Sequence, residues 1–291
     1  MMWLGYNRPY MPQPQPHFAF GKNWANFLVH LNDDRIRGAC DQMQAAIGNL
    51  HGKSFLDVGC GSGLHSLAAL RLGAHRIVSF DFDPESVRCA QELKLRYGAD
   101  CNWRIEQGSA LDETYVRSLG HFDVVYSWGV LHHTGDMWRA LDLIALPARD
   151  KLMVSIYNDQ GFLSSIWRNL KSAYVRHPVT RPVVVLAALA YMWGPKVLLQ
   201  PQRVVRDWRG YYRKRGMSAW HDVIDWAGGY PYEFATPDAV FSFFHERGFQ
   251  LTRLKTCRGR LCCNEFVFTR NSLPTLVSTK TQSPVAAATE V

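Results

Sequence analysis

The sequence has few features of a secreted or metal-binding protein. Its seven cysteines are scattered and odd in number, which argues against a disulfide framework and suits a reducing compartment. No Cys-x-x-Cys pair or similar cluster of ligands is present, so we expect no metal site. The N-terminus lacks a charged region followed by an apolar run, so we expect no secretory signal. A cytoplasmic location is therefore expected.

Long apolar runs are also scarce. The stretch from Pro182 to Pro195 is almost wholly apolar, but its 14 residues fall short of the roughly 20 that a bilayer span needs. We expect a buried helix here. The alternative is peripheral membrane contact through an interfacial helix.

Acidic residues are fewer than basic ones, which gives a formal net charge of +8 over 291 residues. Much of this excess lies between residues 168 and 215. A solvated helical face is the simplest explanation of the charge. An anionic substrate, a nucleic acid or a membrane surface are the alternatives.

The most informative stretch that is present runs from Ser54 to Gly63, with the sequence Ser-Phe-Leu-Asp-Val-Gly-Cys-Gly-Ser-Gly. It predicts a short buried strand, a turn with glycine at alternating positions, and a helix over Leu64 to Leu72. Glycine permits unusual backbone angles and allows a ligand to lie directly against the main chain. The start of a helix supplies unpaired N–H groups that favour electron-rich ligand atoms.

A second strand that ends in an acid follows at an informative distance. Residues Ile77 to Phe80 predict this strand, and Asp81 comes directly after it, about twenty residues beyond the glycine turn. At this spacing a carboxylate reaches the ribose hydroxyls of a bound nucleoside in doubly wound folds. The pair of segments therefore predicts a nucleoside-binding site.

The segment Leu-Asp-Val-Gly-Cys-Gly-Ser-Gly resembles the cofactor loop of class I S-adenosylmethionine-dependent methyltransferases. It differs from the nicotinamide fingerprint, whose third glycine lies three positions after the second. Residues 108–111 and 122–133 strengthen the resemblance, which covers about 51–157 and, more weakly, 236–270. The run Ser-Trp-Gly-Val-Leu-His-His is similar to that of ubiquinone-pathway and natural-product methyltransferases.

This resemblance implies S-adenosylmethionine as methyl donor and S-adenosylhomocysteine as product. Asp57 would help to hold the amino end of the methionine, Asp81 would bind the ribose hydroxyls, and Phe82 would lie beside the adenine. Further contacts are expected from the glycine loop, from the adenine edge and from the end of the fourth strand, namely from Gly59, Cys60, Gly61, Gly63, Ser109, Ala110, Ser127 and Trp128.

The order of apolar segments predicts an α/β fold. Helical and strand patterns alternate, which indicates a Rossmann-like, doubly wound, mostly parallel sheet. The seven strands are expected over residues 55–58, 77–81, 101–107, 123–127, 151–157, 249–256 and 264–269, and the resemblance implies that the last two are antiparallel. A helical insertion follows strand 5.

The expected domain organisation has four parts. Residues 1–50 form an N-terminal arm with capping helices, in which Phe20, Lys22 and Trp24 belong either to a lid over the cofactor or to ordinary packing. The methyltransferase domain comprises 51–157 and 236–270. Residues 158–235 form the helical insertion, a candidate substrate lid, and 271–291 form a disordered tail.

Methyl transfer from a sulfonium is an in-line displacement that depends on positioning, with a general base where the acceptor is protonated. Four residues are candidates for acceptor-side chemistry. His132 and His133 follow strand 4, and their alternative is turn capping or packing on the insertion. Asp159 follows strand 5, with helix capping as its alternative. His221 lies in an aromatic-rich part of the insertion.

The sequence therefore predicts a methyltransferase for a small-molecule acceptor, with oxygen favoured over nitrogen or carbon. An RNA methyltransferase is one alternative because the insertion is basic. However, strand 4 lacks the Asn/Asp-Pro-Pro-aromatic run of enzymes that methylate exocyclic amines, and no RNA-binding module is evident. A non-catalytic protein that binds the cofactor and a membrane through Pro182 to Pro195 is the other alternative.

Overall fold

The computed structural model describes residues 28, 31–211, 218–260 and 262–271, without the side chain of His221. The expected lid residues Phe20, Lys22 and Trp24 lie outside this part of the chain, as do residues 272–291 of the expected tail. The expectations for both therefore stay predictions.

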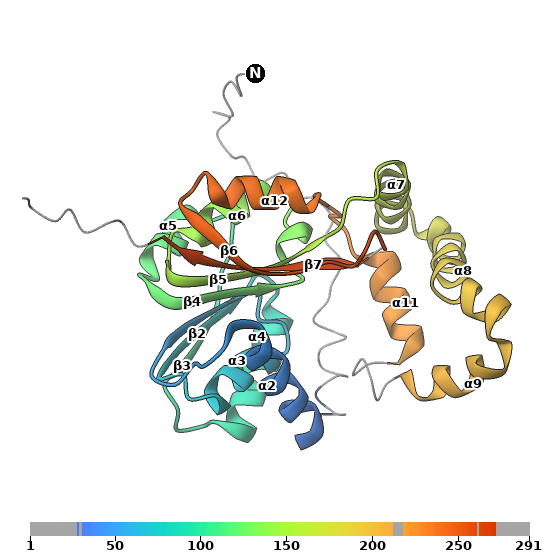
Figure 1. Ribbon diagram of the computed structural model, residues 1–291. Coiled ribbons are helices and arrows are strands. Elements are labelled where there is room, and N and C mark those ends of the chain that lie inside the picture. The colour runs from blue at the N-terminus through green and yellow to red at the C-terminus, as the bar shows by residue number, and fades with distance from the viewer. Residues whose placement is uncertain (1–27, 29–30, 212–217, 261, 272–291) are drawn as a thin grey trace, which may run out of the picture.

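A seven-stranded sheet forms the centre of the molecule, with the strand order β3-β2-β1-β4-β5-β7-β6 (Figure 1). The first five strands pair in parallel, and β7 runs antiparallel to both β5 and β6. The predicted mostly parallel, Rossmann-like sheet is thus confirmed. The strands are β1 (Ser54–Val58), β2 (Arg76–Asp81), β3 (Trp103–Gln107), β4 (Phe122–Trp128), β5 (Ala148–Tyr157), β6 (Phe249–Lys255) and β7 (Cys263–Arg270).

Helices cover both faces of the sheet (Figure 1). One face carries α2 (Asp33–Ile47), α3 (Leu64–Arg71) and α4 (Pro84–Tyr97), and the other carries α5 (Glu113–Ser118), α6 (Met137–Ala145) and α12 (Pro237–His245). Helix α4 begins as its sequence predicts, because Asp83 accepts the N–H of Glu85 and Pro84 follows directly.

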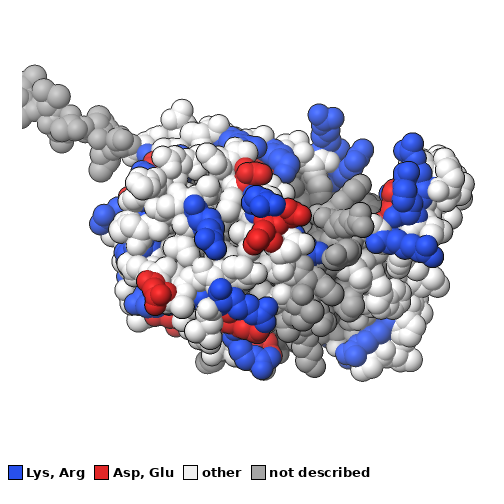
Figure 2. All heavy atoms as spheres, turned by 90° about the horizontal axis from the view of Figure 1, so that it is seen from below, with Lys and Arg blue, Asp and Glu red and all other residues white. Residues whose placement is uncertain are grey.

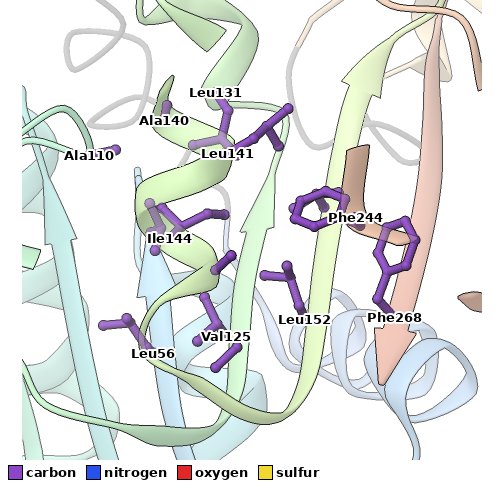
Figure 3. Packing of buried hydrophobic residues seen from close by; sticks show 14 of the residues in the cluster. Leu56, Ala110, Val125, Leu131, Ala140, Leu141, Ile144, Leu152, Phe244 and Phe268 are labelled. Carbon is purple, nitrogen blue, oxygen red and sulfur yellow. The ribbon is translucent and has the colours of Figure 1, made fainter. Parts of the chain in front are cut away.

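Apolar side chains from the central strands fill a separate core on each face. Along β1, Leu56 joins the core under α6 and α12, and Phe55 joins the core under α2 and α3. Figure 3 shows Leu56, Val125 and Leu152 from three neighbouring strands beside Ile144 of α6. Burial on both faces explains why these strands read as continuous apolar runs.

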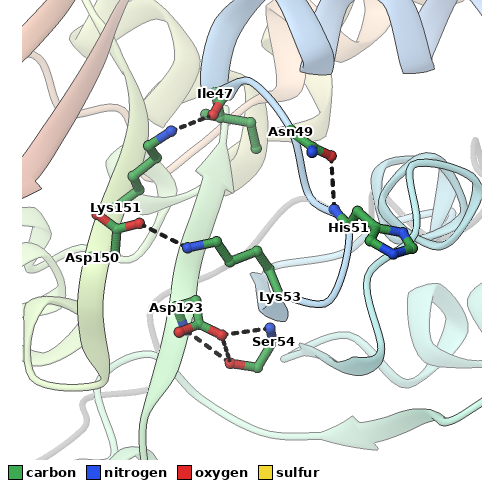
Figure 4. Close-up of polar contacts among 8 residues, drawn as sticks. All are labelled: Ile47, Asn49, His51, Lys53, Ser54, Asp123, Asp150 and Lys151. Carbon is green, nitrogen blue, oxygen red and sulfur yellow. Dashed lines mark hydrogen bonds and ion pairs between the residues drawn. The ribbon is translucent and has the colours of Figure 1, made fainter.

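Polar contacts fix the end of the sheet that lies away from the glycine loop (Figure 4). Asp123 at the start of β4 accepts the main-chain N–H of Ser54 at 2.8 Å and its hydroxyl at 2.7 Å. Lys151 of β5 donates to the carbonyl of Ile47 at the end of α2, at 2.7 Å. These bonds hold the register of β1 against β4 and tie α2 to the sheet.

The chain between β5 and α12 forms a helical insertion, which we define as residues 158–235. It contains α7 (Phe162–Arg176), a 3₁₀ turn η2 (Pro178–Thr180), α8 (Arg181–Leu199), α9 (Pro201–Arg209) and α11 (Ala219–Gly228). Its ends lie side by side, because Ala235 donates to Tyr157 and Asp159 donates to Ala235. The insertion projects beyond one end of the sheet and has an apolar core of its own (Figure 1).

The expectation that Pro182 to Pro195 forms a buried helix is wrong. Helix α8 has 19 residues, with Pro195 inside it, and continues to Leu199. By length and composition, residues 178–199 could cross a membrane, and 17% of their apolar window is buried. Composition alone misled the prediction, because an apolar helix packed in a core and one exposed on a surface have the same residue types.

Candidate cofactor and acceptor sites

The glycine loop lies where the strand order reverses, between β1 and β4, at the carboxyl ends of the strands. Open α/β sheets bind ligands in this crevice. Gly59, Gly61 and Gly63 all have positive φ angles, of 73°, 52° and 79°. Gly63 immediately precedes α3, and no side chain caps that helix. The first turn of α3 therefore points its N–H groups toward the crevice.

Gly59 is required for a second reason besides its backbone angle. A Cβ atom built at this position would lie 2.3 Å from Cγ1 of Val130, far inside van der Waals contact. Val130 precedes the 3₁₀ turn η1 (Leu131–His133). The loop after β4 therefore packs directly on the cofactor loop, and its next residues carry both candidate histidines.

Asp57 lies at the end of a buried chain of hydrogen bonds. The indole N–H of Trp103 donates to Ser79 Oγ at 2.7 Å, and the hydroxyls of Ser79 and Ser66 are 2.6 Å apart. Ser66 Oγ donates to Asp57 Oδ2 at 2.5 Å. Because an indole can only donate and a carboxylate can only accept, the chain runs from Trp103 through Ser79 and Ser66 to Asp57. This chain holds the carboxylate in one orientation.

Asp81 lies next to the loop and is bonded to it. Its Oδ2 accepts the N–H of Gly61 and its Oδ1 accepts the N–H of Asp83, both at 2.9 Å. Burial raises the pKa of Asp57 to about 7 and that of Asp81 to about 6. A positively charged ligand group beside Asp57 would favour the ionised carboxylate. The site is therefore suited to bind a cationic amino group above neutral pH.

The predicted adenine contacts lie on loops beyond β2 and β3. Phe82 is 63% exposed. Ser109 accepts the N–H of Leu111 and holds a turn, while Ala110 is buried in the core. Trp128, at the end of β4, is 43% exposed. These positions are compatible with the predicted cofactor contacts, which remain predictions residue by residue.

Ser127 differs from the expectation that its side chain faces the crevice. It is fully buried, and its hydroxyl donates to the carbonyl of Val58 at 3.1 Å. The side chain therefore connects β4 to β1. Since successive residues of a strand point to opposite sides, Trp128 and Ser127 cannot both face the ligand.

His132 is completely buried beneath the insertion. Its Nδ1 accepts the main-chain N–H of Tyr157 at 3.4 Å, which leaves the proton on Nε2. Burial lowers the pKa of His132 well below its ordinary value. This histidine is therefore neutral and presents an N–H donor, which disfavours it as a general base.

His133 has the opposite tautomer. Its Nδ1 lies 2.6 Å from the carbonyl oxygen of Pro231, and a carbonyl can only accept, so Nδ1 carries the proton. Nε2 is then the basic nitrogen. Of the two neighbouring histidines, His133 thus has the arrangement that a general base needs.

The other two predicted acceptor-side residues receive less support. Asp159 Oδ1 accepts the N–H of Gly161 at 2.6 Å and so holds the turn before α7. No side chain caps α7, so the helix-capping alternative is not observed either. His221 lies in α11, and its side chain is outside the described part of the structure. The role of His221 stays a prediction.

Lys171 of α7 is a buried residue that sequence reasoning missed. Its side chain is fully enclosed, and its ammonium nitrogen donates to the carbonyl of Trp226. It lies 3.8 Å from the ring centre of Trp226 and 4.8 Å from that of Tyr232. Burial lowers its pKa well below the ordinary value, and Asp225 partly opposes this effect. In the sequence, Lys171 looked like one more basic residue of a solvated helix.

These residues belong to one aromatic cluster at the carboxyl end of β5, defined here as His132, His133, Tyr157, Trp226 and Tyr232. The ring centre of Tyr157 lies 3.9 Å from that of His132 and 5.6 Å from that of Trp226. The cluster therefore joins the loop after β4 to the insertion, with Lys171 against it.

Glu233 fastens the insertion to the same loop. Its carboxylate accepts the N–H groups of Gly135 and Met137 at 2.9–3.1 Å, and its own N–H donates to the carbonyl of His132. Burial raises the pKa of Glu233 to about 7. Its partners are about 100 residues away in sequence, so no local pattern could reveal this role.

Several buried N–H groups around the cluster lack partners among the described residues. They are Nε2 of His132 and the indole nitrogens of Trp167 and Trp226. Buried donors without partners are uncommon in native proteins, and a ligand or ordered water is one way to satisfy them. Within the described residues, no group of His, Cys, Asp and Glu side chains could hold a metal ion.

Residues 55–145 match the family model described as a methyltransferase domain. Over these residues the chain carries an S-adenosylmethionine-dependent methyltransferase domain. The matched range contains Asp57, the glycine loop, Asp81 and the loop after β4. The predicted family and methyl donor are therefore confirmed, and they agree with the two acids and the glycine cradle at the crevice.

Similar proteins include ribosomal protein L11 methyltransferases. That of Azotobacter vinelandii is 49% identical over 51 residues, and that of Alteromonas mediterranea is 44% identical over 52 residues. Each match spans 18% of this chain and 18% of the length of the relative. The shared stretch is thus a small part of either protein.

Solved structures show the same fold over most of the chain. Magnesium protoporphyrin IX methyltransferase from Synechocystis PCC 6803, with bound S-adenosylhomocysteine, has a TM-score of 0.51 and 15% identity, and the match covers 87% of this chain and 96% of that one. An O-methyltransferase family protein from Burkholderia thailandensis has a TM-score of 0.51 and 11% identity, with 87% and 60% covered.

Proposed function

We propose that this protein transfers the methyl group of S-adenosylmethionine to an oxygen atom of a small-molecule acceptor held between the cofactor loop and the insertion. One observation supports this most directly. Val130 packs against Gly59 of the cofactor loop, and the residues that follow lead within one turn to His133 in the aromatic cluster. Val130, which contacts the cofactor loop, and His133, which carries the basic nitrogen, therefore lie on one short segment.

Residues at the carboxyl ends of β1 and β2 would bind the methyl donor. Asp57, oriented by Ser66, would hold the amino group of the methionine moiety. Asp81, already bonded to Gly61, would bind the ribose hydroxyls. When bound, S-adenosylmethionine supplies an electrophilic methyl group on a sulfonium. The protein contributes by orienting both reactants, which can lower the barrier by about 7–11 kcal/mol at best.

An oxygen acceptor fits the groups on the acceptor side. A hydroxyl must lose its proton as the new bond forms, and Nε2 of His133 would accept that proton. Lys171, whose pKa burial lowers, adds a second nitrogen that is able to exchange a proton near the cluster. His132 would instead donate a hydrogen bond from Nε2 to the acceptor.

The insertion would also shield the reaction from water. Glu233 ties the returning end of the insertion to the loop after β4, and Tyr157 contacts His132 and Trp226. Aromatic side chains with a few polar groups typically line sites for small organic ligands. A protein acceptor is suggested only by relatives that share 18% of their length with this chain.

The proposal can be tested with the full-length protein and radiolabelled S-adenosylmethionine. Small-molecule, lipid, RNA and protein fractions of a lysate would be offered separately, with Asp57→Asn as the control. We expect label in the small-molecule or lipid extract, lost in the control. Label in RNA or protein alone would contradict the acceptor class. Tight binding of S-adenosylhomocysteine without transfer to any fraction would contradict catalysis.

A further inference from the structure

Helix α8 presents an apolar surface that the described chain leaves uncovered. Val183, Leu186, Ala190 and Val197 recur at helical spacing and are all exposed. Val183 and Leu186 are 67% and 66% exposed, and Leu198 at the end of the helix is 82% exposed. Monomeric proteins rarely expose long apolar stripes of this kind, which usually mark an interaction surface.

The segment that carries this apolar surface is basic. Residues 176–211 contain six arginines and lysines and one acidic residue, Asp207, so they hold more than half of the net charge of +8. Figure 2 shows lysine and arginine side chains on an otherwise largely uncharged surface at the side of the molecule that bears the insertion. Arg203 and Arg209 of α9 are both exposed.

Helices α8 and α9 form a linked pair. Lys196 of α8 lies 2.6 Å from Asp207 of α9, and the rings of Trp193 and Trp208 are 4.7 Å apart. The apolar stripe of α8 and the arginines of α9 are therefore held in a fixed relation.

We propose that α8 and α9 bind the surface of an anionic lipid bilayer, with the apolar stripe of α8 in the acyl boundary and the arginines of α9 at the headgroups. An apolar face flanked by Arg and Lys is the pattern of interfacial membrane helices. Each basic residue near an anionic surface strengthens binding by roughly fivefold. This binding does not depend on the proposed methyl transfer.

The packing of α8 favours an interfacial position over a membrane span. Val184 and Ala188, on the opposite side of the helix from the stripe, are buried in the core of the insertion. A spanning helix would have to expose this side to lipid and separate α8 from α7 and α11. Interfacial binding uses the exposed side and leaves the packed side in place.

Charge also favours a bilayer over a second copy of the chain. A symmetric dimer through α8 would bring two strongly basic segments together, and like charges across an interface oppose association. Nucleic acid would use the arginines but would leave the apolar stripe in water. An anionic bilayer satisfies both features of the surface.

Co-sedimentation with vesicles tests the proposal. We expect the protein to pellet with vesicles of phosphatidylcholine and phosphatidylglycerol, to pellet less with phosphatidylcholine alone, and to be released by alkaline carbonate. Raising the salt concentration from about 0.05 to about 0.5 M shortens the Debye length from roughly 14 to roughly 4 Å. This screening should weaken the electrostatic contribution and therefore the binding.

Two variants with matched controls separate the apolar and electrostatic contributions. Leu186→Glu should weaken vesicle binding at least tenfold, whereas Leu95→Glu, at an apolar residue of α4 that is 74% exposed, should not. Arg203→Glu with Arg209→Glu should weaken binding by roughly twentyfold or more. Arg149→Glu with Arg253→Glu makes the same change in net charge at exposed positions elsewhere and should have little effect.

Binding of S-adenosylhomocysteine serves as the folding check for every variant, since none of these residues lies at the cofactor crevice. Failure of the wild-type protein to pellet with anionic vesicles would overturn the proposal. A stable dimer in solution that Leu186→Glu dissociates would also overturn it, because a second copy would then cover α8. Resistance to alkaline carbonate would contradict the interfacial position.

Discussion

The cofactor side and the acceptor side of this molecule differ in how completely their buried polar groups are hydrogen-bonded. Beside β1, the donors and acceptors from Trp103 to Asp57 form one continuous chain of hydrogen bonds. Beside β5, the N–H groups of His132, Trp167 and Trp226 have no partners among the described residues. The two regions are joined by the contact of Val130 with Gly59.

We interpret this contrast as a protein that is preorganised for its methyl donor, with an acceptor side that a ligand or ordered water would complete. A buried chain of hydrogen bonds holds Asp57 in place before any cofactor arrives. Unpartnered donors, in contrast, remain energetically unfavourable until something accepts from them. Changes on the cofactor side should therefore alter binding of the donor, and changes on the acceptor side should alter turnover.

The largest effect is expected from Gly59→Ala. The new Cβ would clash with Val130 in a backbone conformation that already disfavours side chains, so we expect the free energy of unfolding to fall by about 3 kcal/mol. Binding of S-adenosylhomocysteine, measured by calorimetry, should weaken at least a hundredfold.

Gly120→Ala is the matched control for this substitution. Gly120 has a similar φ of 75°, but nothing lies within 4 Å of a Cβ built there. It should cost about 1 kcal/mol and leave cofactor binding unchanged. Equal losses for the two variants would show that the contact between the two loops is unimportant.

His133→Asn should separate turnover from donor binding. The asparagine amide can still donate to the carbonyl of Pro231, but the basic Nε2 is lost. We expect kcat to fall by about 100-fold or more, with an unchanged affinity for S-adenosylhomocysteine. His132→Asn should instead reduce stability, because it disturbs a fully buried residue. A reversed pattern would assign the base to His132.

Asp57→Asn should have opposite effects on binding and on stability. Loss of the carboxylate should weaken binding of S-adenosylhomocysteine by about 10- to 100-fold at pH 8. The pKa of Asp57 is raised to about 7 in the folded protein, compared with about 3.9 unfolded. The protonated form therefore favours folding, and this stability is lost as the pH rises from about 4 to about 7.

The ligand-free Asp57→Asn protein should accordingly be more stable than wild type at pH 8, by roughly 1–3 kcal/mol, and this advantage should vanish near pH 4. Urea unfolding at the two pH values measures the difference. A variant that is less stable at pH 8 would show that the carboxylate is needed for folding rather than for the ligand.

Lys171→Met should change stability with a pH dependence of the opposite sign. Burial lowers the pKa of Lys171, so this lysine binds more protons in the unfolded chain than in the folded protein, and stability rises with pH up to about 10. The difference in unfolding free energy between the variant and wild type should shrink by up to about 1.4 kcal/mol per pH unit between pH 7 and 9. Lys255→Met, at an exposed lysine, is the control. An unchanged difference would mean that Lys171 keeps its ordinary pKa in the folded protein.

Sequence reasoning predicted the fold and the methyl donor because their signals are local. Asp57 and Gly59 lie within three positions of each other, and the apolar strands on both sides define the fold. The acceptor side depends on contacts across the chain, such as that of Lys171 with Trp226, which lies 55 residues later. A buried lysine and a surface lysine are identical in sequence, so its role could not be predicted.

The predicted burial of α8 failed for a related reason. An apolar composition indicates that burial of a helix is favourable, but it does not identify the surface against which the helix is buried. Ser127 shows the same limit at one residue, because the sequence placed it near the crevice and could not show that its hydroxyl faces Val58.

A crystal structure with S-adenosylhomocysteine bound would test the central claim most directly. We predict that the amino group of the ligand lies against Asp57 and that its sulfur faces the aromatic cluster, within reach of an acceptor bound beside His133. A ligand whose sulfur points away from His133, with the insertion on the other side of the protein from the reacting centre, would contradict the account.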